Sequence, residues 1–164
     1  MSYRDYFKTE RLIIRRFQEE DCEDLRKYAI YKMKTGFEAF NPWPTDSSAC
    51  QDVAKFFAAS DHYWAIERKT DCRMIGFISF NQIDEEKHLD LGYGFTPLYT
   101  ENNENVEALK TMIQYAFDSL PITAIDARNE HEWKEQVEPL FLLGFQPLEE
   151  NRMQMTRTIW DNRK

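Results

Sequence analysis

The segment from residue 89 to residue 120 constrains the fold of this chain more than any other. Its letters, LDLGYGFTPLYTENNENVEALKTMIQYAFDSL, predict a strand that stops at Pro97, a short loop, and an amphipathic helix. The apolar positions of the helix recur at the spacing of one helical face. They are Val106, Leu109, Ile113, Ala116, Phe117 and Leu120. A strand that enters a helix in this way directs the first backbone N–H groups of the helix beyond the strand end, which favours binding of an anion there.

The loop that should hold this anion has opposing chemistry. Thr100–Asn105 contains no glycine and carries Glu101 and Glu104. Glycines would let the backbone N–H groups approach a phosphate without a Cβ in the way. A carboxylate at a helix start stabilises the helix by about 0.3–1 kcal/mol, so these side chains could replace an anionic ligand, and they would repel a diphosphate. The layout favours a phosphate-bearing cofactor and the loop opposes it, so both interpretations stay open.

Length and composition indicate one domain over residues 1–164. The chain has 42% hydrophobic residues and no apolar run of the roughly 18–20 residues that span a bilayer. Its first residues lack the apolar core of a secretion signal. Cys22, Cys50 and Cys72 are far apart and show no C-x-x-C spacing, which is typical of reduced thiols rather than of disulfides or a zinc site. We therefore expect a cytoplasmic protein.

The net charge of −8 limits the classes of partner. Neutralising phosphates needs clustered Lys and Arg, so nucleic acid is disfavoured, and so are anionic membrane surfaces. An acidic surface suits a cationic substrate, such as a polyamine, an aminoglycoside or a basic peptide terminus. The alternative is that the charge only keeps the protein in solution.

Periodicity and turn residues predict one α/β unit without linkers or repeats. Pro139 lies where a helix is expected, so that helix should begin near Val137 or be kinked. Ser47 or Ser48 can cap the second helix, with Val53, Phe56 and Phe57 on its inner face. The expected strands are Glu10–Phe17, Tyr63–Lys69, Met74–Ile83, His88–Phe95, Ala124–Arg128 and Met153–Ile159. The expected helices are Glu19–Tyr31, the one after Ser47 or Ser48, the central one, and one that ends at Gly144.

Six short motifs in this order resemble the GNAT acyltransferase family, in particular its branch of ribosomal-protein alanine N-acetyltransferases. They are Thr9-Glu10-Arg11-Leu12-Ile13-Ile14-Arg15, Glu20-Asp21 with Asp24-Leu25, Met74-Ile75-Gly76-Phe77-Ile78, Asp90-Leu91-Gly92-Tyr93, Ala124-Ile125-Asp126-Ala127-Arg128 and Leu143-Gly144-Phe145. The resemblance implies an α+β fold of three layers. Its mixed, largely antiparallel sheet should have about six to seven strands, flanked by about four helices and splayed between the fourth and fifth strands.

The resemblance also implies acetyl transfer from acetyl-CoA to a primary amine of a small molecule or a protein N-terminus. In the family, a backbone N–H of the fourth strand meets the thioester carbonyl, here near Gly94 and Phe95. The cofactor motifs of the family are degenerate, because Thr100, Asn103 and Asn105 stand at its basic and glycine positions. The implied cofactor residues are Gly94, Phe95, Thr96, Asn102, Asn103, Asn105 and Asn129.

The resemblance also guides the choice of the remaining site residues. Asp90 precedes Gly-Tyr in the resembled motif and is the first candidate for a general base, with Glu67 as the second. A cross-strand ion pair is the structural alternative for Asp90. In the resembled family, the segment between the first two helices forms one wall of the substrate pocket, so Phe37, Trp43 and Tyr93 are candidates for its walls. Trp43 could instead be a plain plug over the sheet. Many members of the resembled family have a tyrosine that acts as general acid at the position that corresponds to Leu140, and leucine cannot donate a proton.

No metal site is expected from the sequence. His88 and Asp90 are two residues apart, but no third ligand is evident beside them. Two functions stay open: an N-acetyltransferase, or a catalytically inactive binding or regulatory module that has lost CoA binding. A homodimer is compatible with either.

Overall fold

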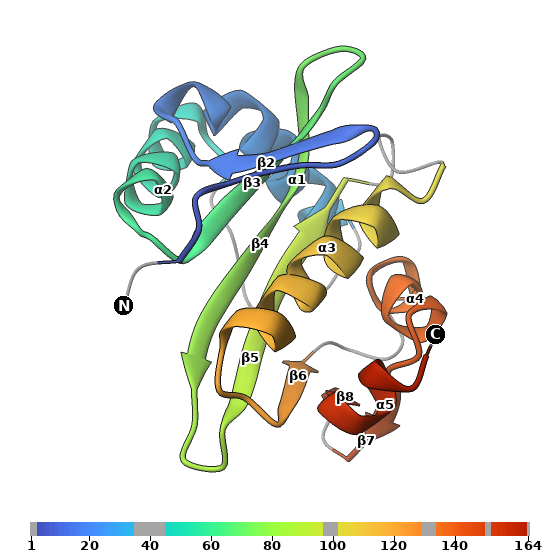
Figure 1. The fold of residues 1–164 in the computed structure, drawn as a ribbon. Coiled ribbons are helices and arrows are strands. Elements are labelled where there is room, and N and C mark those ends of the chain that lie inside the picture. Colours follow the sequence, from blue (N-terminus) through green and yellow to red (C-terminus); the bar gives the residue numbers. More distant parts are fainter. Residues whose placement is uncertain (1–2, 35–44, 97–101, 129–133, 150–151, 164) are drawn as a thin grey trace.

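A single eight-stranded sheet forms the centre of the computed structural model (Figure 1), which describes residues 3–34, 45–96, 102–128, 134–149 and 152–163. The strand order is β1-β2-β3-β4-β5-β6-β8-β7. The strands are β1 (Tyr6–Lys8), β2 (Leu12–Arg16), β3 (Tyr63–Arg68), β4 (Arg73–Ile83), β5 (His88–Phe95), β6 (Ala124–Arg128), β7 (Gln146–Leu148) and β8 (Arg152–Thr156). All neighbouring strands are antiparallel except β5 and β6, which are parallel.

Helices pack on both faces of this sheet, as the three-layer prediction requires. They are η1 (Glu19–Asp21), α1 (Cys22–Lys34), α2 (Ser47–Ala59), α3 (Glu104–Ser119), α4 (Lys134–Leu142) and α5 (Arg157–Asp161). In Figure 1, α3 crosses the near face of β4 and β5, and α2 lies beside the end of the sheet that carries β2 and β3. Within the described ranges, no helix combines the length and the hydropathy needed to cross a membrane.

Two apolar cores follow from the alternation of side chains along the strands. The larger core lies on the α3 face, where Leu109, Met112 and Ile113 pack on strand residues such as Ile78 and Leu91. The smaller core lies on the opposite face. Leu25, Tyr28, Ala54 and Phe57 of α1 and α2 meet Ala65, Met74 and Phe77 there, with Phe17 at the end of β2.

The mixed sheet is confirmed, but it has eight strands rather than six or seven. The additional strands, β1 and β7, are three residues long. A segment of that length shows too little alternation to be recognised from sequence. Both lie at the edges of the sheet, where each pairs with a single neighbour.

The expected C-terminal strand ends early. β8 stops at Thr156, whose hydroxyl accepts a hydrogen bond from the Ile159 N–H at 3.2 Å and caps α5. Of the two expectations for α4, the start near Val137 is wrong, because the helix begins at Lys134; Pro139 lies within the helix. Phe56 does not face the core; its side chain is 63% exposed.

Candidate functional site

The parallel strands β5 and β6 pair only over a short distance. Their register runs from His88 opposite Ala124 to Asp90 opposite Asp126 and ends there, although β5 continues to Phe95. The predicted splay between the fourth and fifth strands of the family therefore lies between β5 and β6, beyond Asp90. Such a divergence in a sheet exposes backbone groups of β5 on the side of β6.

The register of β5 decides which backbone groups face this opening. The Thr96 N–H donates to the Ile75 carbonyl at 3.0 Å, and Phe95 lies opposite Gly76 on β4. Hydrogen-bond direction alternates along an antiparallel strand, so the N–H of Gly94 points to β4, and those of Tyr93 and Phe95 point to the β6 side.

Two glycines of β5 make room for side chains on the α1 face. A Cβ at Gly94 would lie 2.4 Å from the Tyr28 hydroxyl oxygen, and one at Gly92 would lie 2.4 Å from the Ser79 Oγ. Gly94 therefore permits the close approach of α1. It does not mark a β-bulge, because the register of β4 and β5 shifts at Phe80–Gln82 and is regular at Gly94. Burial raises the pKa of Tyr28, so its phenol remains protonated in this position.

The backbone at the start of α3 turns in a left-handed conformation although residues 102–105 include no glycine. Asn103 has φ 63° and ψ 31°, a left-handed conformation that asparagine adopts more readily than most residues. The Asn105 Oδ1 accepts a hydrogen bond from the Val106 N–H at 2.9 Å. Asn102 donates its N–H to the Glu104 carboxylate at 2.9 Å.

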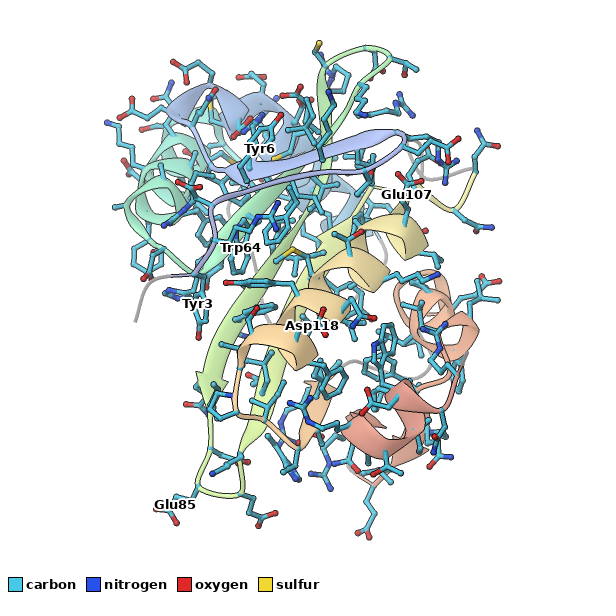
Figure 2. All side chains as sticks on the ribbon, in the orientation of Figure 1. Tyr3, Tyr6, Trp64, Glu85, Glu107 and Asp118 are labelled. Atoms are coloured by element: carbon cyan, nitrogen blue, oxygen red, sulfur yellow. The ribbon has the colours of Figure 1, made fainter. Side chains whose placement is uncertain are left out.

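Two arginines, one just before β2 and one at the end of β3, form ion pairs with the carboxylates in the first turn of α3. Glu104 is 3% exposed and lies 3.8 Å from Arg11 Nη1 and 3.6 Å from Arg68 Nη1. Arg11 also pairs with Glu107 at 2.7 Å and donates to the Asn102 carbonyl at 2.7 Å. Figure 2 places Glu107 at the end of α3 next to the β1–β2 hairpin. The negative charge of Glu104, which opposes a diphosphate, is thus partly offset by two cations, although Arg11 also pairs with Glu107 and Arg68 with Asp71.

Backbone donors remain at this end of α3. Among the described residues, the N–H groups of Asn103, Glu104 and Asn105 have no hydrogen-bond partner, whereas Glu107 donates to the Asn103 carbonyl at 3.2 Å. Unpaired N–H groups in the first turn of a helix, together with the helix dipole, attract an anion. The helix end can therefore still hold a phosphate group.

Asp90 lies at the point where β5 and β6 diverge. Its carboxylate accepts a hydrogen bond from the Asn81 amide at 3.3 Å, so a neighbouring amide rather than an arginine holds it. Its register partner Asp126 is buried and accepts from Gln154 at 2.8 Å. His88 contacts Asp126 at 3.3 Å between Nδ1 and Oδ2.

Glu67, the second predicted base, lies far from Asp90. Glu67 of β3 lies opposite Met74 of β4, and Asp90 of β5 lies opposite Gln82 of the same strand β4. At about 3.3 Å per residue, this separates the two carboxylates by about 26 Å along the sheet. Glu67 accepts a hydrogen bond from Arg15 Nε at 2.9 Å in a network with Asp21. The structure does not bring the two candidates together.

The other predicted site residues fall into two groups. Tyr93, Phe95 and Thr96 are buried, the first two in the core on the α3 face. Burial also raises the pKa of Tyr93. The rest lie outside the described residues: Phe37, Trp43, Thr100, Glu101 and Asn129.

Arg11, Arg68 and Asn81 were not identified as site residues from the sequence. Arg11 lies in the motif at the start of β2, but nothing in that motif shows that its side chain reaches α3. Arg68 ends β3 and Asn81 follows the buried run of β4, positions that are usually solvent-exposed. Only the pairing of the strands brings them to the site.

Comparison with known proteins finds a matching family and a curated relative. A family model described as an acetyltransferase (GNAT) domain matches residues 11–135. A curated relative, "Uncharacterized N-acetyltransferase p20" of Bacillus licheniformis, is 29% identical over 145 residues, which covers 84% of this chain and 80% of the relative.

Solved structures of the same fold are similar over almost the whole chain. A GNAT-family acetyltransferase from Bacillus anthracis superposes with a TM-score of 0.77 at 16% identity, covering 92% of this chain and 98% of that one. Spermidine N-acetyltransferase from Vibrio cholerae, solved with CoA and spermine, superposes with a TM-score of 0.73 at 12% identity, covering 94% and 100%.

Proposed function

Because the chain belongs to the GNAT acetyltransferase family, we propose that it transfers an acetyl group from acetyl-CoA to a primary amine of a small molecule or a protein N-terminus. The observation that carries this proposal is the divergence of β5 and β6 beyond Asp90, with the start of α3 at the far end of β5. One opening could then receive the thioester arm while the helix end receives the diphosphate.

The residues at both ends of this opening fit the cofactor. The N–H groups of Asn103, Glu104 and Asn105 would hold the diphosphate, and Arg11 and Arg68 offset the charge of Glu104. N–H groups on the β6 side of β5 would meet the thioester carbonyl and stabilise the charge that develops on its oxygen. The cofactor supplies the activated acetyl group.

Asp90 is the proposed general base. An amine attacks only as the neutral species, so its proton must leave before or during formation of the N–C bond. The Asp90 carboxylate can accept this proton directly or through one water, and the Asn81 amide keeps it oriented. Glu67 is a weaker candidate, because it is engaged by Arg15.

The acceptor belongs to the same proposal. Its class follows from the charge of −8, which favours a cationic amine. Phe37, Trp43 and Tyr93 remain candidates for the pocket walls, and Asn129 for the far end of the cofactor. The setting we propose is cytoplasmic, with the whole chain acting as one domain, alone or as a homodimer.

The alternative function is a GNAT-fold module without catalysis. It is favoured by Glu104, which already takes the Asn102 N–H, and by Leu140, which is fully buried where many relatives carry a tyrosine. The module would bind a partner without acetyl-CoA.

Binding and turnover separate these functions. Acetyl-CoA at 100 times its Kd stabilises a folded protein by about 2.7 kcal/mol, which raises the Tm of a domain of this size by roughly 5–10 °C. Release of free CoA with a panel of amines then measures transfer, and Asp90→Asn should lower kcat by about 10²-fold or more with little change in acetyl-CoA affinity. If millimolar acetyl-CoA leaves the Tm unchanged, the enzyme proposal is wrong and the module is favoured.

A further inference from the structure

A group of three potential metal ligands lies below the divergence of β5 and β6. Asp84 comes from the β4–β5 turn, His88 from the start of β5 and Asp126 from β6, and their ligand atoms all lie within 4.8 Å of one another. The sequence offered only His88 and Asp90, without a third ligand. The fold replaces Asp90 in this set with two carboxylates from neighbouring segments. We propose that Asp84, His88 and Asp126 form a binding site for a divalent cation of the zinc type.

The closest pair in the group has the separation that zinc ligands need. His88 Nδ1 and Asp126 Oδ2 are 3.3 Å apart. Two ligands bound to a tetrahedral zinc at about 2.0–2.1 Å are about 3.3–3.4 Å from one another. A cation can therefore sit between these two atoms without movement of either strand. Asp84, on the turn, supplies the third ligand atom, a carboxylate oxygen within 4.8 Å of the other two.

Each carboxylate is oriented by hydrogen bonds to one of its oxygens. Asp126 Oδ1 accepts from Gln154 Nε2 at 2.8 Å, which leaves Oδ2 facing His88. Asp84 Oδ1 accepts from the backbone N–H groups of His88 and Glu86, both at 2.9 Å, which leaves its second oxygen. Outer hydrogen bonds of this kind hold metal ligands in place.

Two charged side chains next to the group affect its affinity for a metal ion in opposite directions. The Glu86 carboxylate lies 3.9 Å from His88 Nε2 and adds negative potential. Arg152 Nη1 lies 3.5 Å from Asp126 Oδ2 and is the cation that now faces the buried carboxylate. The Arg152 side chain is 31% exposed, so it can turn to solvent when a metal binds. Arg152 should therefore weaken metal binding, whereas His88 and Asp126 should support it.

The donor set selects the metal. One imidazole and two carboxylates suit Zn²⁺ and Mn²⁺, whereas Mg²⁺ and Ca²⁺ prefer oxygen ligands alone. The inference does not depend on acetyl transfer, because the ligands come from the β4–β5 turn, the start of β5 and the paired part of β6, and not from the opening beyond Asp90.

Calorimetric titration of the full chain with Zn²⁺ alone tests the site, and Co²⁺ absorption identifies the ligands. We expect one saturable site. Its cobalt spectrum should show no thiolate charge-transfer band, which distinguishes the proposed site from metal binding by the three free cysteines. His88→Gln and Asp126→Asn should each weaken binding by about tenfold or more. Arg152→Gln should tighten it several-fold, an opposite change that non-specific binding would not give.

The matched control is His62→Gln. His62 Nδ1 also lies 3.3 Å from a carboxylate oxygen, that of Asp61, but this pair belongs to no three-ligand group among the described residues. Its variant should bind Zn²⁺ as the parent does. The proposal is overturned if the parent shows no saturable site, if His88→Gln retains it, or if His62→Gln loses as much affinity.

Discussion

Glu104 is the single residue on which the conflict between layout and loop chemistry turns. Its carboxylate lies among the N–H groups that a diphosphate would need, and Arg11 and Arg68 partly offset its charge. Glu104→Gln keeps an oxygen for the Asn102 N–H but removes the negative charge. We expect it to tighten acetyl-CoA binding about three- to tenfold, the size of a partly screened interaction at a helix end. Calorimetric titration measures the Kd.

Two controls test whether the tighter binding of acetyl-CoA by Glu104→Gln comes from its diphosphate. Asp118→Asn removes the same charge at the opposite end of α3, as Figure 2 shows, and should leave the Kd unchanged. Acetyl-pantetheine lacks the diphosphate, so Glu104→Gln should not alter its binding. Weaker acetyl-CoA binding by Glu104→Gln would mean that the carboxylate shapes the loop rather than competing with the ligand.

At the residue scale, local conformation was predictable and ion pairing was not. The left-handed Asn103 follows from the tolerance of asparagine for that geometry. The partners of Glu104 did not follow, because Arg11 and Arg68 are distant in sequence and meet α3 only through the sheet. A carboxylate at a helix start looks the same in sequence whether it is exposed or buried against cations.

At the scale of elements, α3 is fixed at its C-terminal end by one arginine. Arg157 donates to the carbonyls of Phe117 at 2.7 Å, Leu120 at 3.1 Å and Ile122 at 2.8 Å. These carbonyls would otherwise lack donors at the helix end. Arg157→Met should lower the free energy of unfolding by about 2–4 kcal/mol, because several bonds to a charged donor are lost.

Urea unfolding measures this loss of stability, and Arg163→Met serves as the control variant. The Arg163 guanidinium stacks 4.2 Å from the centre of the Trp160 ring at the end of the chain and is exposed. Its loss should cost less than about 1 kcal/mol. Equal effects of the two substitutions would show that Arg157 does not hold the end of α3.

Long elements with clear periodicity were predicted well. β5 runs from His88 to Phe95, as expected, and Gly144 ends α4 with φ 96°. The short elements were missed, since β1, β7 and α5 depend on pairing or on a single cap. Pro139 lies within α4, as expected, but the helix begins at Lys134 rather than near Val137, because contacts of Val137 and Leu140 with the core support a helix that proline weakens.

At the scale of the whole molecule, the Glu107 carboxylate in the first turn of α3 links stability to pH. Burial raises the pKa of Glu107, but hydrogen bonds from Thr9 and Arg11 outweigh it, so the pKa lies below the ordinary value of 4.5. A depressed pKa in the folded state stabilises the protein above pH 4.5 and loses this contribution as pH falls through the folded-state value. The free energy of unfolding should therefore decrease as the pH falls from about 5 to about 3.

Glu107→Gln tests the assignment of this effect. At pH 7 it should destabilise the protein by about 1–3 kcal/mol, since bonds to a charged acceptor are weakened. Near pH 3 the parent and variant should be almost equally stable. A constant difference between them at the two pH values, measured by urea unfolding, would assign the acid sensitivity to other carboxylates.

The two outer strands of the sheet have a consequence for association. β1 and β7 are each three residues long, and β7 carries Pro147, which has no N–H to offer a further strand. Short and proline-blocked borders resist the recruitment of another chain by backbone pairing. Concentrated solutions should therefore stay free of cross-β fibrils, and any dimer must assemble through helices or loops.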